Sequence, residues 1–241
     1  MLIVRNLDKL IDERKVLDHI SFQADPGEFI SILGGSGSGK STLLKCLALR
    51  DTWTNGQYIH DGNEVTSANW LSRFTFKNKI VYLEEKVQLD PNQTAISYVL
   101  SGRRTTFPLW RKITFTTPEE EYMKAMDILE HVGLLDKAKQ KLGQLSGGEK
   151  QRVAIAYALA KGANIIIADE PVTGLDPHSA GKLLNDIKEL CSKKSVTFIC
   201  TLHQTEFAEK YASRIWGMAD GKVIFDISGR RLTQGEKQRI F

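Results

Sequence analysis

The stretch Gly34-Gly35-Ser36-Gly37-Ser38-Gly39-Lys40-Ser41-Thr42 decides the fold of this chain. It follows a short apolar run, residues 29–33, that has the composition of a buried strand, and it opens a helical run over residues 43–49. A glycine-rich loop that ends in Gly-Lys-Ser between a strand and a helix is typical of a phosphate-binding loop. A flexible glycine- and serine-rich linker would not account for Lys-Ser-Thr at this position. All nine residues are therefore predicted to bind nucleotide.

The chemistry expected of this loop follows from its residue types. Glycines permit positive φ, so successive N–H groups can converge on phosphate oxygens at a helix N-terminus. Lys40 would bridge the β- and γ-phosphates, which makes it a catalytic candidate, and the Ser41 hydroxyl would bind Mg²⁺. ATP and Mg²⁺ are the predicted cofactors.

A second apolar run, residues 164–168, is followed directly by Asp169 and Glu170. Ligands of open parallel sheets bind at the carboxyl ends of the strands, which is where these two carboxylates fall. We expect Asp169 to hold Mg²⁺ through water and Glu170 to act as the general base for the attacking water. An acidic helix N-terminus favoured by the dipole would explain either residue alone, but not the pair together with the phosphate loop.

Strand-like and helical patterns alternate along the chain, which favours an α/β fold with a mainly parallel sheet. Residues 196–200 form a third central strand, and Asp220-Gly221 predicts a hairpin over residues 215–227. Between the first two central strands, Thr117 and Pro118 would begin a helix that Gly133 ends. We predict a single domain of 241 residues, with a core lobe over about 1–92 and 161–228, a helical lobe over about 93–160, and a tail over 229–241.

Composition excludes several other classes of protein. The formal net charge of +4 is small and scattered, so no nucleic-acid partner is expected. The three cysteines have no metal-binding spacing. No apolar run approaches the ~18 residues that span a bilayer, and the N-terminus becomes charged too early for a signal peptide. The chain is therefore not expected to form a transmembrane pathway itself.

A second anion-facing helix start is predicted at Leu145-Ser146-Gly147-Gly148-Glu149-Lys150-Gln151-Arg152. A hydroxyl and two glycine amides precede a helical pattern, so Ser146, Gly147 and Gly148 are candidate nucleotide-binding residues. One nucleotide seldom needs two such helix ends from one chain. A homodimer that encloses ATP is therefore expected.

In this order along the chain, GGSGSGKST, LSGGEKQR and IIIADEP resemble the motifs of ABC-type ATPases, and the likeness covers nearly the whole sequence. The resemblance implies a RecA-like parallel-sheet core, an antiparallel β subdomain and an inserted helical lobe. It also implies a head-to-tail dimer with two ATPs clamped between the phosphate loop of one copy and the signature of the other. Thr173-Gly174-Leu175-Asp176 is similar to the D-loop, so Asp176 is a nucleotide-binding candidate. His203 resembles the switch histidine and is a third catalytic candidate.

Two positions depart from the family pattern. An aromatic residue usually stacks on adenine early in the chain, whereas Leu10 or Ile11 stands at the matching place. Glu85 replaces the Q-loop glutamine at the end of a strand-like run, and it is a candidate metal ligand. An ionised carboxylate accepts hydrogen bonds but donates none. We therefore hypothesise that Glu85 slows closure of the ATP-bound dimer or makes this closure more dependent on Mg²⁺. Gln88 is the alternative for the same role.

Residues 201–204, 211–217, 99–103 and 109–111 resemble the ATPases of phosphonate and phosphite importers. The resemblance implies integral-membrane permease subunits, a periplasmic or lipid-anchored binding protein that acts indirectly, and a place on the cytoplasmic face of the membrane. An accessory role in a non-transport complex, such as one for phosphonate degradation, is the alternative. A basic and aromatic cluster lies near the predicted permease groove or forms a solvated loop; it comprises Arg103, Arg104, Phe107, Trp110, Arg111, Lys112 and Phe115.

The tail repeats part of the signature. Residues 232–241 match residues 145–154 at six of ten positions, with Gly-Glu-Lys-Gln-Arg unbroken. An exposed charged helix that matches by chance explains this. The other hypothesis is a signature mimic that restrains the free subunit, for which truncation after Ser228 should raise basal ATPase activity.

Overall fold

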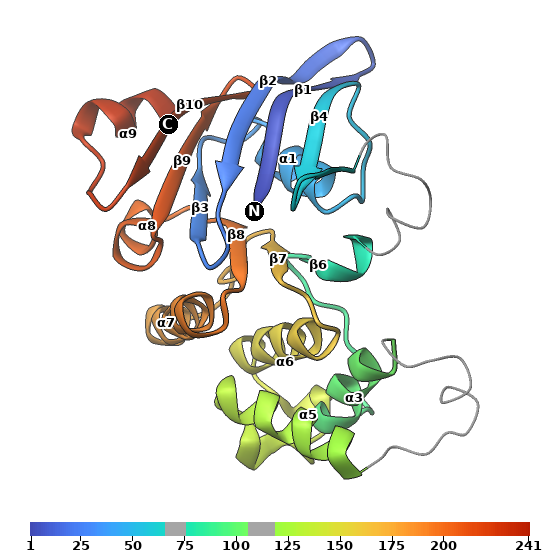
Figure 1. Cartoon of the computed structure of the whole chain (residues 1–241). Coiled ribbons are helices and arrows are strands. Elements are labelled where there is room, and N and C mark those ends of the chain that lie inside the picture. Colours follow the sequence, from blue (N-terminus) through green and yellow to red (C-terminus); the bar gives the residue numbers. More distant parts are fainter. Residues whose placement is uncertain (66–75, 106–118) are drawn as a thin grey trace.

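The computed structural model describes residues 1–65, 76–105 and 119–241, which form a central sheet, a second sheet and surrounding helices (Figure 1). The central sheet has six strands in the order β10-β9-β3-β8-β7-β6. All neighbours are parallel except the β9–β10 pair. The strands are β3 (Phe29–Leu33), β6 (Ile80–Leu83), β7 (Ile165–Ala168), β8 (Thr197–Thr201), β9 (Arg214–Ala219) and β10 (Lys222–Ser228).

The predicted α/β fold with a mainly parallel sheet is confirmed. Strands β3, β7 and β8 lie where the three apolar runs predicted them, and every residue of the three is buried. Burial on both faces explains why these runs are mostly apolar instead of alternating between apolar and polar residues. The predicted hairpin is also present: Asp220 and Gly221 join β9 to β10 with φ of 47° and 74°.

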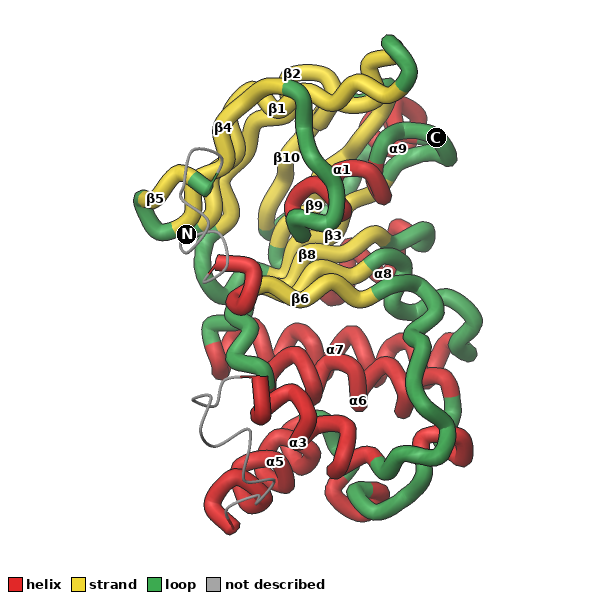
Figure 2. Tube along the Cα trace, turned by 90° about the vertical axis from the view of Figure 1, so that its right-hand side faces the viewer, coloured by secondary structure: helices red, strands yellow, loops and turns green. Residues whose placement is uncertain are grey.

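A four-stranded antiparallel sheet covers one side of the molecule in the order β2-β1-β4-β5. Helix α1 (Lys40–Leu47) packs between the two sheets (Figure 2). Leu43 and Leu44 of α1 belong to one apolar cluster with Leu2 of the antiparallel sheet and Ile32 of the central sheet. This burial fixes the helix whose N-terminus carries the phosphate loop. The strands are β1 (Leu2–Ile11), β2 (Arg14–Ala24), β4 (Asn55–His60) and β5 (Asn63–Glu64).

The helices between β6 and β7 gather at the far end of the molecule from the antiparallel sheet (Figure 1). The predicted helix of this region ends as expected, because Gly133 has a φ of 68° just after α5. Its predicted start at Thr117 and Pro118 lies outside the described residues, as do Phe107, Trp110, Arg111, Lys112 and Phe115 of the basic cluster. The helices are α3 (Ala95–Thr105), α5 (Glu119–His131) and α6 (Gly147–Ala160), with 3-10 turns at Leu135–Lys137 and Leu142–Gln144.

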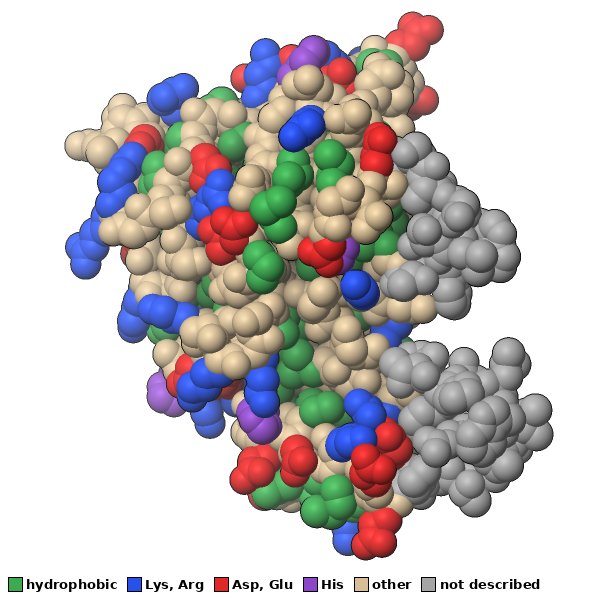
Figure 3. All heavy atoms as spheres, viewed as in Figure 1, with side chains coloured by type: hydrophobic (Ala, Val, Ile, Leu, Met, Phe, Trp, Pro, Cys, Tyr) green, Lys and Arg blue, Asp and Glu red, His purple; other side chains and the backbone are tan. Residues whose placement is uncertain are grey.

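The remaining helices are α7 (Pro177–Lys194), α8 (Thr205–Tyr211) and α9 (Gln234–Ile240). In the parts of the chain that the structure describes, no helix combines the length and apolarity needed to cross a membrane. Acidic and basic side chains are interspersed over the face drawn in Figure 3, without a field of one sign.

Candidate active site

The phosphate loop joins β3 to α1 in the conformation that the sequence predicts. Gly37 and Gly39 have φ of 79° and 97°, the left-handed region that favours glycine. The backbone N–H groups of Gly37, Gly39 and Lys40 donate no hydrogen bond within the described residues. These donors sit at the start of α1, where the helix dipole favours an anion. The loop therefore fits a phosphate group.

Lys40 turns back over this loop. Its ammonium group donates to the carbonyl oxygens of Gly34 at 2.9 Å and Gly35 at 2.8 Å, and its side chain is buried. Burial lowers the pKa of Lys40, whereas the negative charges of Glu170 and Asp169 act in the opposite direction. These two carbonyl oxygens and the Ser38 hydroxyl carry no charge, so an anion that reaches the buried Lys40 cation stabilises it. A polyphosphate would supply such an anion.

Three neighbouring segments support the loop, and the sequence alone did not predict them. A Cβ on Gly34 would lie 2.3 Å from the carbonyl oxygen of Met218 in β9. A Cβ on Gly39 would lie 2.9 Å from the carbonyl oxygen of Val16 in β2. The amide of Gly221, in the β9–β10 turn, donates to the Ser38 carbonyl at 3.2 Å. Because backbone approaches this closely, Gly34 and Gly39 leave no room for a side chain.

The two predicted carboxylates lie at the end of β7, and Thr201 at the end of β8 connects them. Its hydroxyl donates to Asp169 Oδ1 at 2.7 Å and accepts from the amide of Glu170 at 2.8 Å. Tyr82 of β6 donates to Asp169 Oδ2 at 3.4 Å. Sequence reasoning gave neither Thr201 nor Tyr82 this role. The contact of Thr201 with Asp169 follows from the pairing of Ala168 with Cys200, and this strand register cannot be read from the sequence.

Glu170 and His203, both predicted to be catalytic, lie in contact. His203 Nε2 donates to Glu170 Oε1 at 2.5 Å, and the hydroxyl of Thr173 donates to Glu170 Oε2 at 2.9 Å. Glu170 has a φ of 49°, which is uncommon for a side chain of its size and typical of functional sites. The three residues line a cavity of about 230 Å³. Both carboxylate oxygens are thus held in a fixed direction beside open space.

The signature segment begins α6 with a complete capping box. Ser146 Oγ accepts from the amide of Glu149 at 3.4 Å, and the Glu149 carboxylate accepts from the amide of Ser146 at 2.9 Å. Ser146 and Gly147 are exposed, which leaves this helix start accessible to a second molecule. A Cβ on Gly147 would lie 3.2 Å from Leu175, so the glycine lets the predicted D-loop pack closely.

Asp176 has a structural task in this arrangement. Its carboxylate accepts from the amides of His178 and Ser179 at 3.0 Å and caps α7. These bonds lower its pKa, with those to Ser179 largest. The predicted contact of Asp176 with nucleotide stays a prediction, as do the roles of the other candidate residues.

The two departures from the family pattern lie at accessible positions. Leu10 and Ile11, at the end of β1, are 43% and 42% exposed, so either can make apolar contact with a flat ring. Glu85 is also exposed, and its carbonyl oxygen accepts from Gln151 Nε2 of α6 at 3.2 Å. Gln88, the alternative to Glu85, lines the groove described below. Among the described residues, the one group of three or more His, Cys, Asp or Glu side chains that could hold a metal is Asp8, Asp18 and His19, so Asp169 and Glu85 share no such group.

Replacing Glu85 by Gln tests its predicted effect on closure. Removing a negative charge near a triphosphate should raise ATPase activity at low Mg²⁺ about threefold, an electrostatic effect of below ~1 kcal/mol at an exposed site. The measurement is the Mg²⁺ dependence of steady-state hydrolysis, with Glu84→Gln as the matched control. An unchanged Mg²⁺ dependence in Glu85→Gln would reject the hypothesis and favour Gln88.

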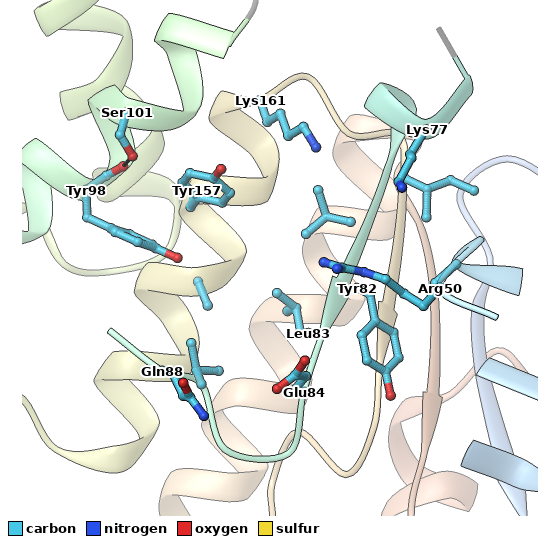
Figure 4. A pocket seen from close by; sticks show the side chains of 15 residues that line it. Arg50, Lys77, Tyr82, Leu83, Glu84, Gln88, Tyr98, Ser101, Tyr157 and Lys161 are labelled. Atoms are coloured by element: carbon cyan, nitrogen blue, oxygen red, sulfur yellow. Dashed lines mark hydrogen bonds between the residues drawn. The ribbon is translucent and has the colours of Figure 1, made fainter. Parts of the chain in front are cut away.

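A separate groove of about 500 Å³ lies between β6, α3 and α6 (Figure 4). The ends of Arg50, Lys77 and Lys161 point into the same part of it. Burial lowers the pKa of Lys161, and the positive charges of Arg50 and Lys77 lower it further. None of the three cations forms an ion pair within the described residues. On the opposite wall, the rings of Tyr98 and Tyr157 lie 4.8 Å apart.

Comparisons with known proteins show the family to which the chain belongs. The family model described as "ABC transporter" matches residues 17–173. The chain is 34% identical over 241 residues to a phosphonates import ATP-binding protein of Bradyrhizobium diazoefficiens, covering 100% of this chain and 90% of the relative. A protein of the same name from Staphylococcus aureus is 34% identical over 238 residues, covering 98% and 93%.

Solved structures give the same answer for the fold. The ATP-binding cassette MJ0796, solved as a dimer in a post-hydrolysis state with ADP and Pi, has a TM-score of 0.79 and 29% identity, covering 96% of this chain and all of that one. The cassette MJ1267 in its ADP conformation has a TM-score of 0.82 and 27% identity, covering 95% and 91%. With its phosphate loop, paired carboxylates and signature helix in place, the chain is an ATP-binding, ATP-hydrolysing subunit of the ABC transporter family.

Proposed function

We propose that this subunit powers the import of a phosphonate or a related oxyanion through a separate integral-membrane permease. The observation that carries the proposal is the likeness to phosphonates import ATP-binding proteins over essentially the whole chain, and the contact between Glu170 and His203 at the candidate site supports it. In this proposal the subunit lies on the cytoplasmic face of the membrane, and a periplasmic or lipid-anchored binding protein delivers the substrate to the permease.

The catalytic unit in this proposal is a head-to-tail homodimer formed on ATP binding. Each phosphate loop would meet the exposed Ser146 and Gly147 of the other copy, which can donate a hydroxyl and an amide to a phosphate. Ser41 and Asp169 would hold Mg²⁺, which would neutralise charge that develops on the phosphates. Glu170, directed by His203 and Thr173, would then accept a proton from the attacking water.

The groove between β6, α3 and α6 is the proposed site for the permease. It joins the strand that leads to Glu85 with the helices of the predicted lobe 93–160, so a segment seated there would contact both parts. Arg50, Lys77 and Lys161 point into it without a partner carboxylate among the described residues. We therefore propose that the seated permease segment carries an acidic side chain, because opposite charge relieves the repulsion among the three cations.

Uptake of a labelled phosphonate by cells that lack this gene tests the proposal. Wild-type protein should restore uptake. Lys161→Glu should reduce uptake at least tenfold while ATP hydrolysis by the isolated chain stays within twofold, because the groove is separate from the site at Glu170 and His203. Lys193→Glu, an exposed change on α7, is the matched control and should behave as wild type.

The outcomes separate the alternatives. Normal uptake in the deletion strain, with loss of growth on phosphonate as sole phosphorus source, would replace import by an accessory role in phosphonate degradation. Loss of uptake with Lys161→Glu indistinguishable from wild type would leave import in place but reject the acidic contact.

A further inference from the structure

The C-terminal helix α9 docks directly on the phosphate loop of its own chain. The amide of Gly35 donates to the carbonyl oxygen of Ile240 at 2.6 Å. Ile240 is only 3% exposed and belongs to the same apolar cluster as Ile215 of β9 and Ile227 of β10. The last turn of the chain is therefore a packed part of the nucleotide site. Figure 1 shows α9 beside β9 and β10, away from the predicted helical lobe.

Several contacts fix α9 in this position. Thr233 and Glu236 form a capping box, and Arg230 pairs with Glu236 at 2.5 Å. This pairing lowers the pKa of Glu236 to about 2, so the cap stays charged at any pH near neutrality. Glu209 of α8 accepts from the amide of Leu232 at 3.1 Å and pairs with Lys237 at 3.0 Å. The helix is thus tied to α8 at its start and to the loop at its end.

One peptide group of the loop is held from both sides. The carbonyl oxygen of Gly34 accepts from Lys40 at 2.9 Å, and the N–H of Gly35, in the same peptide, donates to Ile240. Because a peptide group is planar and rigid, contacts at its two ends set its orientation. The glycines on either side contribute no side chains that could do so. Lys40 and α9 together therefore determine how the loop leaves β3.

ATP binding would change one of the two contacts that hold the Gly34–Gly35 peptide. To reach a phosphate oxygen, Lys40 must leave the carbonyl oxygens of Gly34 and Gly35. The contact with Ile240 does not need to break, because other amides of the loop, among them those of Gly37, Gly39 and Lys40, have no acceptor among the described residues. We propose that Ile240 is a positioning residue for ATP: its carbonyl holds the Gly34–Gly35 peptide in place while Lys40 exchanges carbonyl oxygens for phosphate.

The likeness of the tail to the signature has a simple structural basis in this view. Ser146 with Glu149 and Thr233 with Glu236 form the same capping box, so both helices need the same spacing of hydroxyl and carboxylate. The mimic hypothesis and the positioning proposal predict opposite results. Removing a mimic that restrains the subunit would raise the hydrolysis rate, whereas removing a positioning contact would weaken ATP binding.

The test compares a chain that lacks the Ile240 carbonyl with a variant that keeps this carbonyl but loses the buried side chain that holds it in place. In a Glu170→Gln background, equilibrium binding of MgATP is measured for a chain that ends at Arg239 and for Ile240→Ala. The shortened chain loses the hydrogen bond to Gly35, and Ile240→Ala loses the buried side chain that places the carbonyl, so each should raise the Kd about threefold to tenfold. In the wild-type background, kcat should stay within twofold while KM rises. Ile240→Val should restore most of the affinity.

Two controls separate positioning from a general loss of stability. Phe241→Ala changes an exposed side chain and should leave the Kd unchanged. Leu129→Ala removes buried apolar surface in α5, away from the loop, and should lower the Tm without raising the Kd. An unchanged Kd in the shortened chain would overturn the proposal. A raised kcat at constant Kd would also overturn it and would favour the signature mimic. A rise in Kd for Leu129→Ala equal to that of the shortened chain would overturn it as well.

Discussion

The Glu170→Gln variant is expected to hydrolyse ATP about 10²–10⁴-fold more slowly than wild type at saturating MgATP, the usual contribution of a general base. The substitution keeps the size of the side chain but removes its ability to accept a proton. His203 and Thr173 donate to the two carboxylate oxygens at 2.5 and 2.9 Å, and both donors suit a carboxylate better than the NH2 group that glutamine would place there. Steady-state release of phosphate measures the effect.

The same variant should bind ATP normally, because Gly37, Gly39 and Lys40 are unchanged. If two copies enclose ATP, the variant should accumulate as an ATP-dependent dimer in size-exclusion chromatography. Thr173→Val is the matched control: it removes one contact to Glu170 but leaves the carboxylate, so its rate should fall by about tenfold or less. A Glu170→Gln variant that keeps more than a tenth of wild-type activity would show that another group accepts the proton.

The sequence was sufficient where structure is determined locally. Residues 29–33, 164–168 and 196–200 are apolar except for one polar residue in each run, and a strand buried on both faces favours that pattern. The turn at Asp220-Gly221 and the helix end at Gly133 could also be predicted locally, because glycine adopts positive φ more readily than other residues. The phosphate loop was predictable since its function depends on its own backbone.

The contacts that complete the site depend on parts distant in the sequence. Thr201 reaches Asp169 only because β7 and β8 pair in one register, and single residues carry no sign of that register. The tail was recognised as similar to the signature, but its docking on Gly35 depends on how α9 packs against β9. Sequence likeness suggested a mimic of the signature, whereas tertiary packing places the end of α9 against the phosphate loop of its own chain.

The cost of a side chain at Gly39 follows from this packing. With a φ of 97°, alanine would be strained by about 1–2 kcal/mol. Its Cβ would also lie 2.9 Å from the carbonyl oxygen of Val16 in β2. We expect Gly39→Ala to weaken MgATP binding by about 10²–10³-fold, since strain and a backbone clash together cost ~3–4 kcal/mol.

Gly37→Ala is the matched comparison, because it isolates the clash. Gly37 has a φ of 79°, but a Cβ there meets no atom within 4 Å. Its backbone strain alone should weaken binding by about tenfold. Equilibrium binding in the Glu170→Gln background measures both variants without turnover. Equal losses of affinity would mean that the loop moves away from Val16 at no cost, and that the segments around the loop do not determine its shape. A loss at least tenfold larger for Gly39→Ala would assign that role to the packing of β2 against the loop.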